Sequence, residues 1–160
     1  MTQRRVVDNV ASILEQETQS SIRDWLLRVE HNPQFIDVRL DCEVRCAHLP
    51  HLFRDLVSRL RYPFPLGSRA LTSPSAAEHG RLRQKQGYTA AMLVEESRML
   101  QASIFQTLQN NVQRVDLGLL LVGVMAIADE VDSQLAQAMA CYVSEKSILC
   151  PSKLVARSVI

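Results

Sequence analysis

The sequence has few residues that break regular structure and few aromatic side chains. Its 160 residues include only 5 glycines and 6 prolines, which excludes a collagen-like or loop-rich chain. Aromatic residues make up 5% of the chain, whereas leucine, valine, alanine and glutamine are plentiful. This balance favours helices over a β-sandwich. A chain of this length buries about 70% of its unfolded surface, so its core needs no metal ion or disulfide.

An excess charge of either sign is also missing. The 18 Lys and Arg residues nearly balance 17 Asp and Glu residues, so no global field attracts nucleic acid or an anionic membrane. The longest apolar run, residues 117–128, would span about 18 Å as a helix, which is too short for a hydrocarbon core of about 30 Å. The first residues lack the apolar stretch of a secretory signal. We therefore expect a cytoplasmic protein with reduced cysteines, no nucleic-acid partner and no membrane insertion.

Helical periodicity runs through nearly the whole chain. Apolar residues between positions 6 and 29 recur at helical spacing around a polar middle, which fits one long helix or two pieces. A loop is expected over residues 62–72, and Gly87 should separate two later helices. Helix starts or N-caps are predicted at four positions: Leu49, Ser73, Thr89 and Asp116.

The last helix has the most regular pattern. A heptad seam is formed by Leu117, Leu121, Val124, Ala128, Val131, Leu135, Ala138 and Tyr142. Its first half is apolar on every face, which predicts a central place in a bundle. We predict an all-α antiparallel bundle of four to six helices with a long C-terminal helix over 117–145. Residues 1–150 would form this single domain, and residues 151–160 a flexible tail.

Apolar residues off the seam add a prediction about assembly. The last helix also carries Leu119, Leu120, Val122, Met125 and Ile127. Together with the seam they exceed what one helix face can bury, so we expect a homodimer that pairs through the terminal helices.

Motifs of known catalytic sites are missing. The chain has no Gly-rich phosphate loop, no Gly-x-Ser-x-Gly turn, no His-Glu-x-x-His and no Glu-x-x-His pair of a di-iron bundle. The densest group of metal-ligand types is Cys42, Cys46, His48 and His51. Its spacing matches no zinc pattern, and cysteines often pack as small hydrophobes, so Cys42 and Cys46 are only weak metal candidates. We predict no enzyme activity, no metal and no cofactor.

A stretch in the middle of the chain resembles a known family. Residues 79–89 read His-Gly-Arg-Leu-Arg-Gln-Lys-Gln-Gly-Tyr-Thr, and residues 93–96 read Leu-Val-Glu-Glu. Over residues 20–145 the chain resembles the helical N-terminal domain of RsbT co-antagonist (RsbRD-type) proteins, which is similar to input domains ahead of bacterial sensor histidine kinases. Trp25 matches the tryptophan of the family's first helix and Tyr142 fits its last helix. Ser97 departs from the family, which commonly has an aromatic residue there.

The resemblance implies a non-catalytic input domain of bacterial signal transduction, including two-component systems. Such a domain senses a signal or docks, and regulates an effector such as a histidine kinase or a stress-response regulator. A protein partner is implied, and a small-molecule ligand fits the same role. Two alternatives remain at this point: a phosphotransfer bundle with His79 as phospho-acceptor, and a bundle that binds haem or another small molecule.

The family-like stretch also predicts a polar centre. Gly87 marks a turn between two helices, and His79 and Glu96 each lie about eight residues from it, at the same height of an antiparallel pair. Arg83 is one turn after His79 on the same face, within reach of Glu95 or Glu96. We therefore expect His79, Arg83 and Glu96 to form a structural clamp or a ligand site, with Trp25 and Tyr142 in the core.

Overall fold

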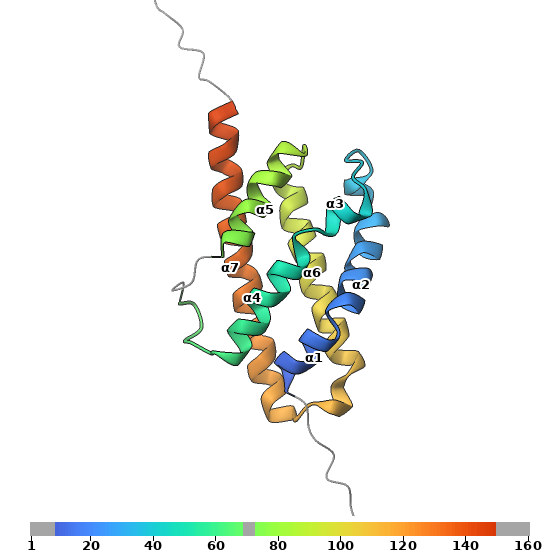
Figure 1. The fold of residues 1–160 in the computed structure, drawn as a ribbon, viewed down its shortest axis with the longest axis vertical. Helices are drawn as coiled ribbons and strands as arrows, with labels where there is room; N and C mark the ends of the chain where they lie inside the picture. Colours follow the sequence, from blue (N-terminus) through green and yellow to red (C-terminus); the bar gives the residue numbers. More distant parts are fainter. Residues whose placement is uncertain (1–8, 69–72, 150–160) are drawn as a thin grey trace, which may run out of the picture.

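The computed structural model describes residues 9–68 and 73–149, and within these ranges it contains helices and no strands (Figure 1). The predicted all-α bundle with a long C-terminal helix is confirmed. The α-helices are α1 (Val10–Gln16), α2 (Thr18–Glu30), α3 (Cys42–Cys46), α4 (Leu49–Arg61), α5 (Pro74–Lys85), α6 (Ala90–Asn110) and α7 (Leu117–Leu149). Two short 3-10 turns, η1 (Pro33–Phe35) and η2 (Val112–Arg114), lie between them. The predicted tail, residues 151–160, lies outside the described residues.

Side-chain caps define the starts of α5 and α6. The Ser73 hydroxyl accepts a hydrogen bond from the backbone N–H of Ala76, and the Thr89 hydroxyl accepts one from Met92, so both predicted N-caps are confirmed. Gly87 has φ +86°, the left-handed conformation that favours glycine and reverses the chain between α5 and α6. The N-terminal helical stretch is two pieces, which meet at Glu17.

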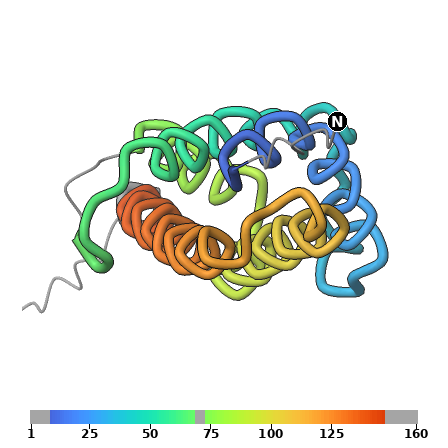
Figure 2. Tube along the Cα trace, turned by 90° about the horizontal axis from the view of Figure 1, so that it is seen from below, coloured from blue at the N-terminus to red at the C-terminus, as the bar shows by residue number. Residues whose placement is uncertain are grey.

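Long-range packing joins the helices into a bundle. Helix α5 packs along α7, α2 along α6, α1 against α4, and α6 beside α7. Seen from below, α6 and α7 lie side by side and α1 and α4 lie across from them (Figure 2). Trp25 of α2 is fully buried, as predicted, and Tyr142 of α7 is 6% exposed.

Helices α5 and α7 cross in close contact at Gly80. A Cβ added to Gly80 would lie 1.9 Å from the backbone oxygen of Ala138 and 2.6 Å from its carbonyl carbon. Only a residue without a side chain fits at this crossing. Gly80 therefore sets the distance between α7 and the helix that carries His79.

The first half of α7 is not central, contrary to the prediction from its composition. Leu117, Leu121 and Val122 are 74%, 65% and 63% exposed, whereas Ile127 and Val131 are buried. The neighbouring helices cover α7 mainly from Ala126 onward, because α5 packs along its later turns. Among the described residues, no helix combines the length and the apolar character needed to cross a membrane.

Candidate functional site

A buried cluster of charged and ionisable side chains lies between α5 and α6. His79 and Arg83 come from α5 and Glu96 from α6. The Nε2 atom of His79 lies 3.3 Å from Oε2 of Glu96, and Arg83 donates hydrogen bonds to both carboxylate oxygens at 2.7–3.1 Å. The side chains of His79, Arg83 and Glu96 are 8%, 0% and 3% exposed. The predicted contact between His79 and Glu96 is confirmed, and of the two glutamates considered it is Glu96 that Arg83 binds.

Arg83 connects this pair to a third helix. Its Nη2 atom donates to the backbone oxygen of Arg45, in α3, at 2.6 Å, and its Nη1 atom donates to Gln86 at 2.7 Å. The guanidinium also lies 4.8 Å from the centre of the Tyr88 ring, in cation–π contact. Arg83 therefore links α3, α5 and α6 through buried hydrogen bonds.

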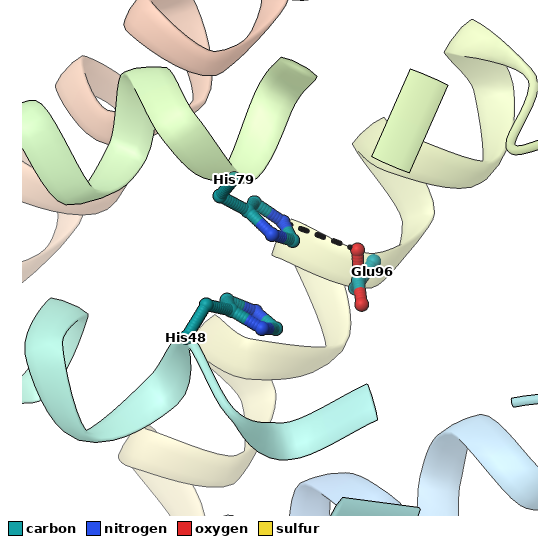
Figure 3. A group of neighbouring side chains, drawn as sticks. All are labelled: His48, His79 and Glu96. Atoms are coloured by element: carbon teal, nitrogen blue, oxygen red, sulfur yellow. Dashed lines mark ion pairs between the residues drawn. The ribbon is translucent and has the colours of Figure 1, made fainter. Parts of the chain in front are cut away.

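His48 is a member of the cluster that the sequence analysis missed. It lies at the N-terminal end of α4, and its ring stacks on the His79 ring at 3.7 Å with an angle of 10° between the planes (Figure 3). Its Nδ1 atom is 3.4 Å from Nη2 of Arg83. In the sequence His48 falls into the group with Cys42, Cys46 and His51, and no local spacing indicates a contact with a residue 31 positions later.

The two cysteines do not share a site with His48. Cys42 is exposed, and its thiol donates a hydrogen bond to Glu30 at 3.4 Å. Cys46 is partly buried, and burial raises the pKa of its thiol. A higher pKa favours the protonated thiol over the thiolate that binds a metal ion, so it weakens Cys46 as a metal ligand.

Aromatic hydroxyl and indole groups hold the cluster in place. The indole N–H of Trp25 donates to the backbone oxygen of Glu96 at 3.1 Å, and Arg45 donates to the Tyr88 hydroxyl at 2.8 Å. The Tyr142 hydroxyl donates to the backbone oxygen of Tyr88 at 2.7 Å, which joins α7 to the turn after α5. Tyr88 and Arg45 are further residues of the site that the sequence analysis did not single out, although Tyr88 lies within the family-like stretch.

Burial and charge determine the protonation of the cluster. Burial lowers the pKa of His48 well below its usual range, and the charges of His79 and Arg83 lower it further. Burial alone would raise the pKa of Glu96, but hydrogen bonds and charges from His79 and Arg83 outweigh it and hold that pKa below its usual value. Burial, followed by the charge of Glu96, raises the pKa of Tyr88 to about 12. At neutral pH the site therefore contains a carboxylate, a guanidinium and a neutral His48.

A small cavity adjoins the cluster. It measures about 30 Å³, and His48, His79 and Glu96 form part of its wall together with mostly apolar side chains that include Trp25 and Leu93. A space of this size holds one or two water molecules. The Nδ1 atom of His79 is buried and has no hydrogen-bond partner among the described residues, so the cluster retains unused binding capacity.

Comparison of the chain with protein-family models, with curated proteins and with solved structures gives no match. The function is therefore argued from the site itself.

We expect the contact between His79 and Glu96 to contribute to stability. His79→Ala and Glu96→Ala should each lower the melting temperature, because each removes the contact between two buried side chains. A double-mutant cycle measured by chemical denaturation should give a coupling of about 0.5–3 kcal/mol. A double variant whose loss of stability equals the sum of the two single losses would contradict a direct interaction.

The partly buried His48 should make the free energy of unfolding depend on pH. Its pKa is lower in the folded chain than in the unfolded chain, so the unfolded chain binds more protons and stability falls as the pH drops below about 7. Between pH 7.5 and 5.5 this histidine should cost about 1.4 kcal/mol. Urea unfolding of the wild type and of His48→Gln in a buffer with chelator measures the difference.

The control is His51→Gln, because His51 is exposed on the same helix. His51→Gln should keep the pH dependence of the wild type, whereas His48→Gln should lose most of it. Equal pH dependence in the two variants would mean that His48 is not held neutral by the fold.

Proposed function

We propose that this chain is a non-catalytic input domain of bacterial signal transduction, which senses a small signal at the buried cluster and regulates a protein effector. The observation that carries the proposal is the contact of His79, Arg83 and Glu96 in the core of the bundle. Burying charged groups there costs free energy, and through Arg83 these groups link α3, α5 and α6. A change at this centre alters the packing between helices, which is how a bundle passes a signal on. The resemblance to RsbRD-type domains supports this role, and we propose that the domain acts in the cytoplasm.

The size of the site favours sensing over catalysis. Glu96 and Arg83 are almost fully enclosed, and the adjoining cavity of about 30 Å³ does not admit an organic substrate. Typical ligand pockets measure about 300–1,000 Å³. A haem also does not fit this cavity. The closed cluster can respond to a proton, a water molecule or a small ion.

Histidine phosphotransfer is less well supported. A phospho-acceptor histidine has to be reached by a donor protein, but His79 is 7% exposed. Its Nε2 atom faces Glu96, and the ring of His48 covers one of its faces. The carboxylate of Glu96 would also repel an incoming phosphoryl group.

The exposed first half of α7 supports self-association. Residues 117–128 contain no charged side chain, and Leu117, Leu121 and Val122 are more than 60% exposed. A groove of about 390 Å³ runs beside them, lined in part by Val10 of α1 and Leu119. An apolar surface of this kind on a signalling module suits a second copy of the chain, which would pair α1 and α7.

The expected assembly is a dimer at micromolar concentration. Leu121→Glu should shift sedimentation toward the monomer, because it places a charge in the apolar surface without disturbing the core. Val143→Glu is the matched control, since Val143 is 54% exposed near the other end of α7. A monomeric wild type, or dimers in both variants, would contradict the proposed interface.

The signalling role is tested through the effector. The tagged chain, isolated from its own host, should bring down a regulator, and the purified chain should then change the activity of that regulator. Glu96→Gln should alter this effect by more than about 5-fold, the lower end of typical allosteric coupling. Arg81→Met should not, because the Arg81 side chain is 42% exposed and, among the described residues, pairs with Glu78 outside the cluster. A regulator that responds equally to wild type and Glu96→Gln would contradict the proposal.

A further inference from the structure

The buried cluster brings three metal-ligand groups to one place. His48, His79 and Glu96 each offer an atom, and these atoms all lie within 4.8 Å of one another. They come from the start of α4, from α5 and from α6, as Figure 3 shows. Two imidazoles and a carboxylate are the donor set of many catalytic zinc sites, where a water takes the fourth position.

The distance between His79 and Glu96 suits an ion. Two ligand atoms bound to one tetrahedral ion at about 2.0–2.1 Å lie about 3.3 Å apart. The Nε2 atom of His79 and the Oε2 atom of Glu96 are 3.3 Å apart, which is longer than most direct hydrogen bonds between these groups. An ion could therefore replace the proton between them with little movement of α5 or α6.

His48 is the third ligand and needs a rotation. Its ring lies parallel to that of His79 at 3.7 Å, so their nitrogen lone pairs run side by side and do not meet at one point. Turning the His48 ring about χ2, a torsion with a broad energy minimum, directs a nitrogen toward the ion. The adjoining cavity of about 30 Å³ leaves room for a water in the fourth position.

Arg83 is the group that an ion would displace. A dication and a guanidinium compete for the same carboxylate, and repulsion between them is strong in a buried site. Arg83 also donates to Gln86, at the partly buried end of the cluster, so its side chain has a way toward solvent. Leaving Glu96 would break its bond to the backbone of Arg45 and release α3 from α5. Ion binding would thus change the contact between helices.

We propose that His48, His79 and Glu96 bind a divalent transition metal ion of the zinc or cobalt type, and that binding expels Arg83 from Glu96. The proposal rests on the sensing role proposed above and names the class of signal. Water would complete the coordination from the side of the cavity.

Fluorescence of the single tryptophan tests the proposal on the full chain. The Trp25 ring centre is 5.9 Å from that of His48, so a bound Co²⁺ should quench its emission in a saturable way, with half-saturation well below about 1 mM. Zn²⁺, which does not quench by itself, should compete and restore the emission. Absence of saturable quenching of the chelator-treated wild type up to about 1 mM would overturn the proposal.

Variants of the proposed ligands test where the ion binds. His48→Gln and His79→Gln should each weaken Co²⁺ binding by more than about 100-fold, since each removes a direct ligand. His51→Gln, three residues along α4, and a Cys42→Ser/Cys46→Ser double variant should bind like the wild type. Binding that survives both histidine variants, or that is lost with the cysteines, would overturn the proposal.

If a variant does not fold, the visible absorption spectrum of Co²⁺ bound to the wild type identifies the ligands instead. Co²⁺ held by nitrogen and oxygen ligands gives visible d–d bands without a thiolate charge-transfer band in the near ultraviolet. A thiolate band would move the ion to the cysteines and overturn the proposal. If the chain binds no metal ion but Glu96→Gln still alters its effect on the regulator, the metal site is wrong and the signalling role stands. If the chain binds the metal ion but does not affect a regulator, the signalling role is wrong and the metal site stands.

Discussion

Arg83→Met is expected to lower the free energy of unfolding by about 3–5 kcal/mol, the cost of removing one partner from a buried ion pair. Arg83 is fully buried and makes its bonds to Glu96 through Nε and Nη2. Without it, the Glu96 charge would retain, among the described residues, His79 and a long contact of 3.5 Å from the Tyr88 hydroxyl. The backbone oxygen of Arg45 would also lose its donor. Urea denaturation followed by circular dichroism measures the loss.

Two further variants make this test specific. Arg81→Met removes an ion pair from the same helix, but Arg81 is 42% exposed on its side chain, so the expected loss is under about 1 kcal/mol. Arg83→Met combined with Glu96→Gln removes both charges and should lose less than the two single changes added together. A loss from Arg83→Met no larger than that from Arg81→Met would mean that the pair does not hold the bundle.

Helix boundaries are the part of the fold that the sequence predicts best. Capping depends on residues within one turn, so Ser73, Thr89 and Gly87 indicate helix starts and a reversal without any knowledge of tertiary structure. The antiparallel return at Gly87 then places His79 opposite Glu96. This part of the site could be predicted because one short turn and two regular helices determine it.

The remaining part of the site depends on contacts distant in sequence. His48 reaches His79 only because α4 packs beside the hairpin, and the bond from Trp25 to the backbone of Glu96 joins residues 71 positions apart. Helical periodicity indicates which face of a helix is apolar, but not which helix covers it. The family-like stretch therefore marks α5 and α6 and leaves His48 and Arg45 unmarked.

In the first half of α7 the sequence pattern predicts burial that the fold does not provide. An all-apolar stretch predicts burial, and Ile127 is indeed fully buried. Leu121 and Val122 are exposed because no helix within residues 9–68 and 73–149 covers that side of the early turns. Composition indicates that burial of this apolar surface is favourable, but it does not indicate whether the same chain or a second copy covers it.

Gly80→Ala is expected to destabilise the fold by about 3 kcal/mol, although alanine is the better helix former. The new Cβ would lie 1.9 Å from the Ala138 oxygen and 2.8 Å from its Cα, and these are backbone atoms that no side-chain rotation can move. Helix α5 would have to separate from α7. That movement would also shift His79, the preceding residue, relative to Glu96. Thermal and urea unfolding of the variant measure the loss.

Gly118→Ala is the matched control for this steric argument. Gly118 is exposed in the first turn of α7, and a Cβ there would meet only the flexible Asp116 side chain, at 3.1 Å. This change should leave stability unchanged or raise it by up to about 1 kcal/mol, because it reduces the backbone entropy of the unfolded chain. The two glycines thus predict effects of opposite sign for the same substitution. If Gly80→Ala were also neutral or stabilising, α5 and α7 could not cross as closely as described, and the position of His79 would have to be revised with them.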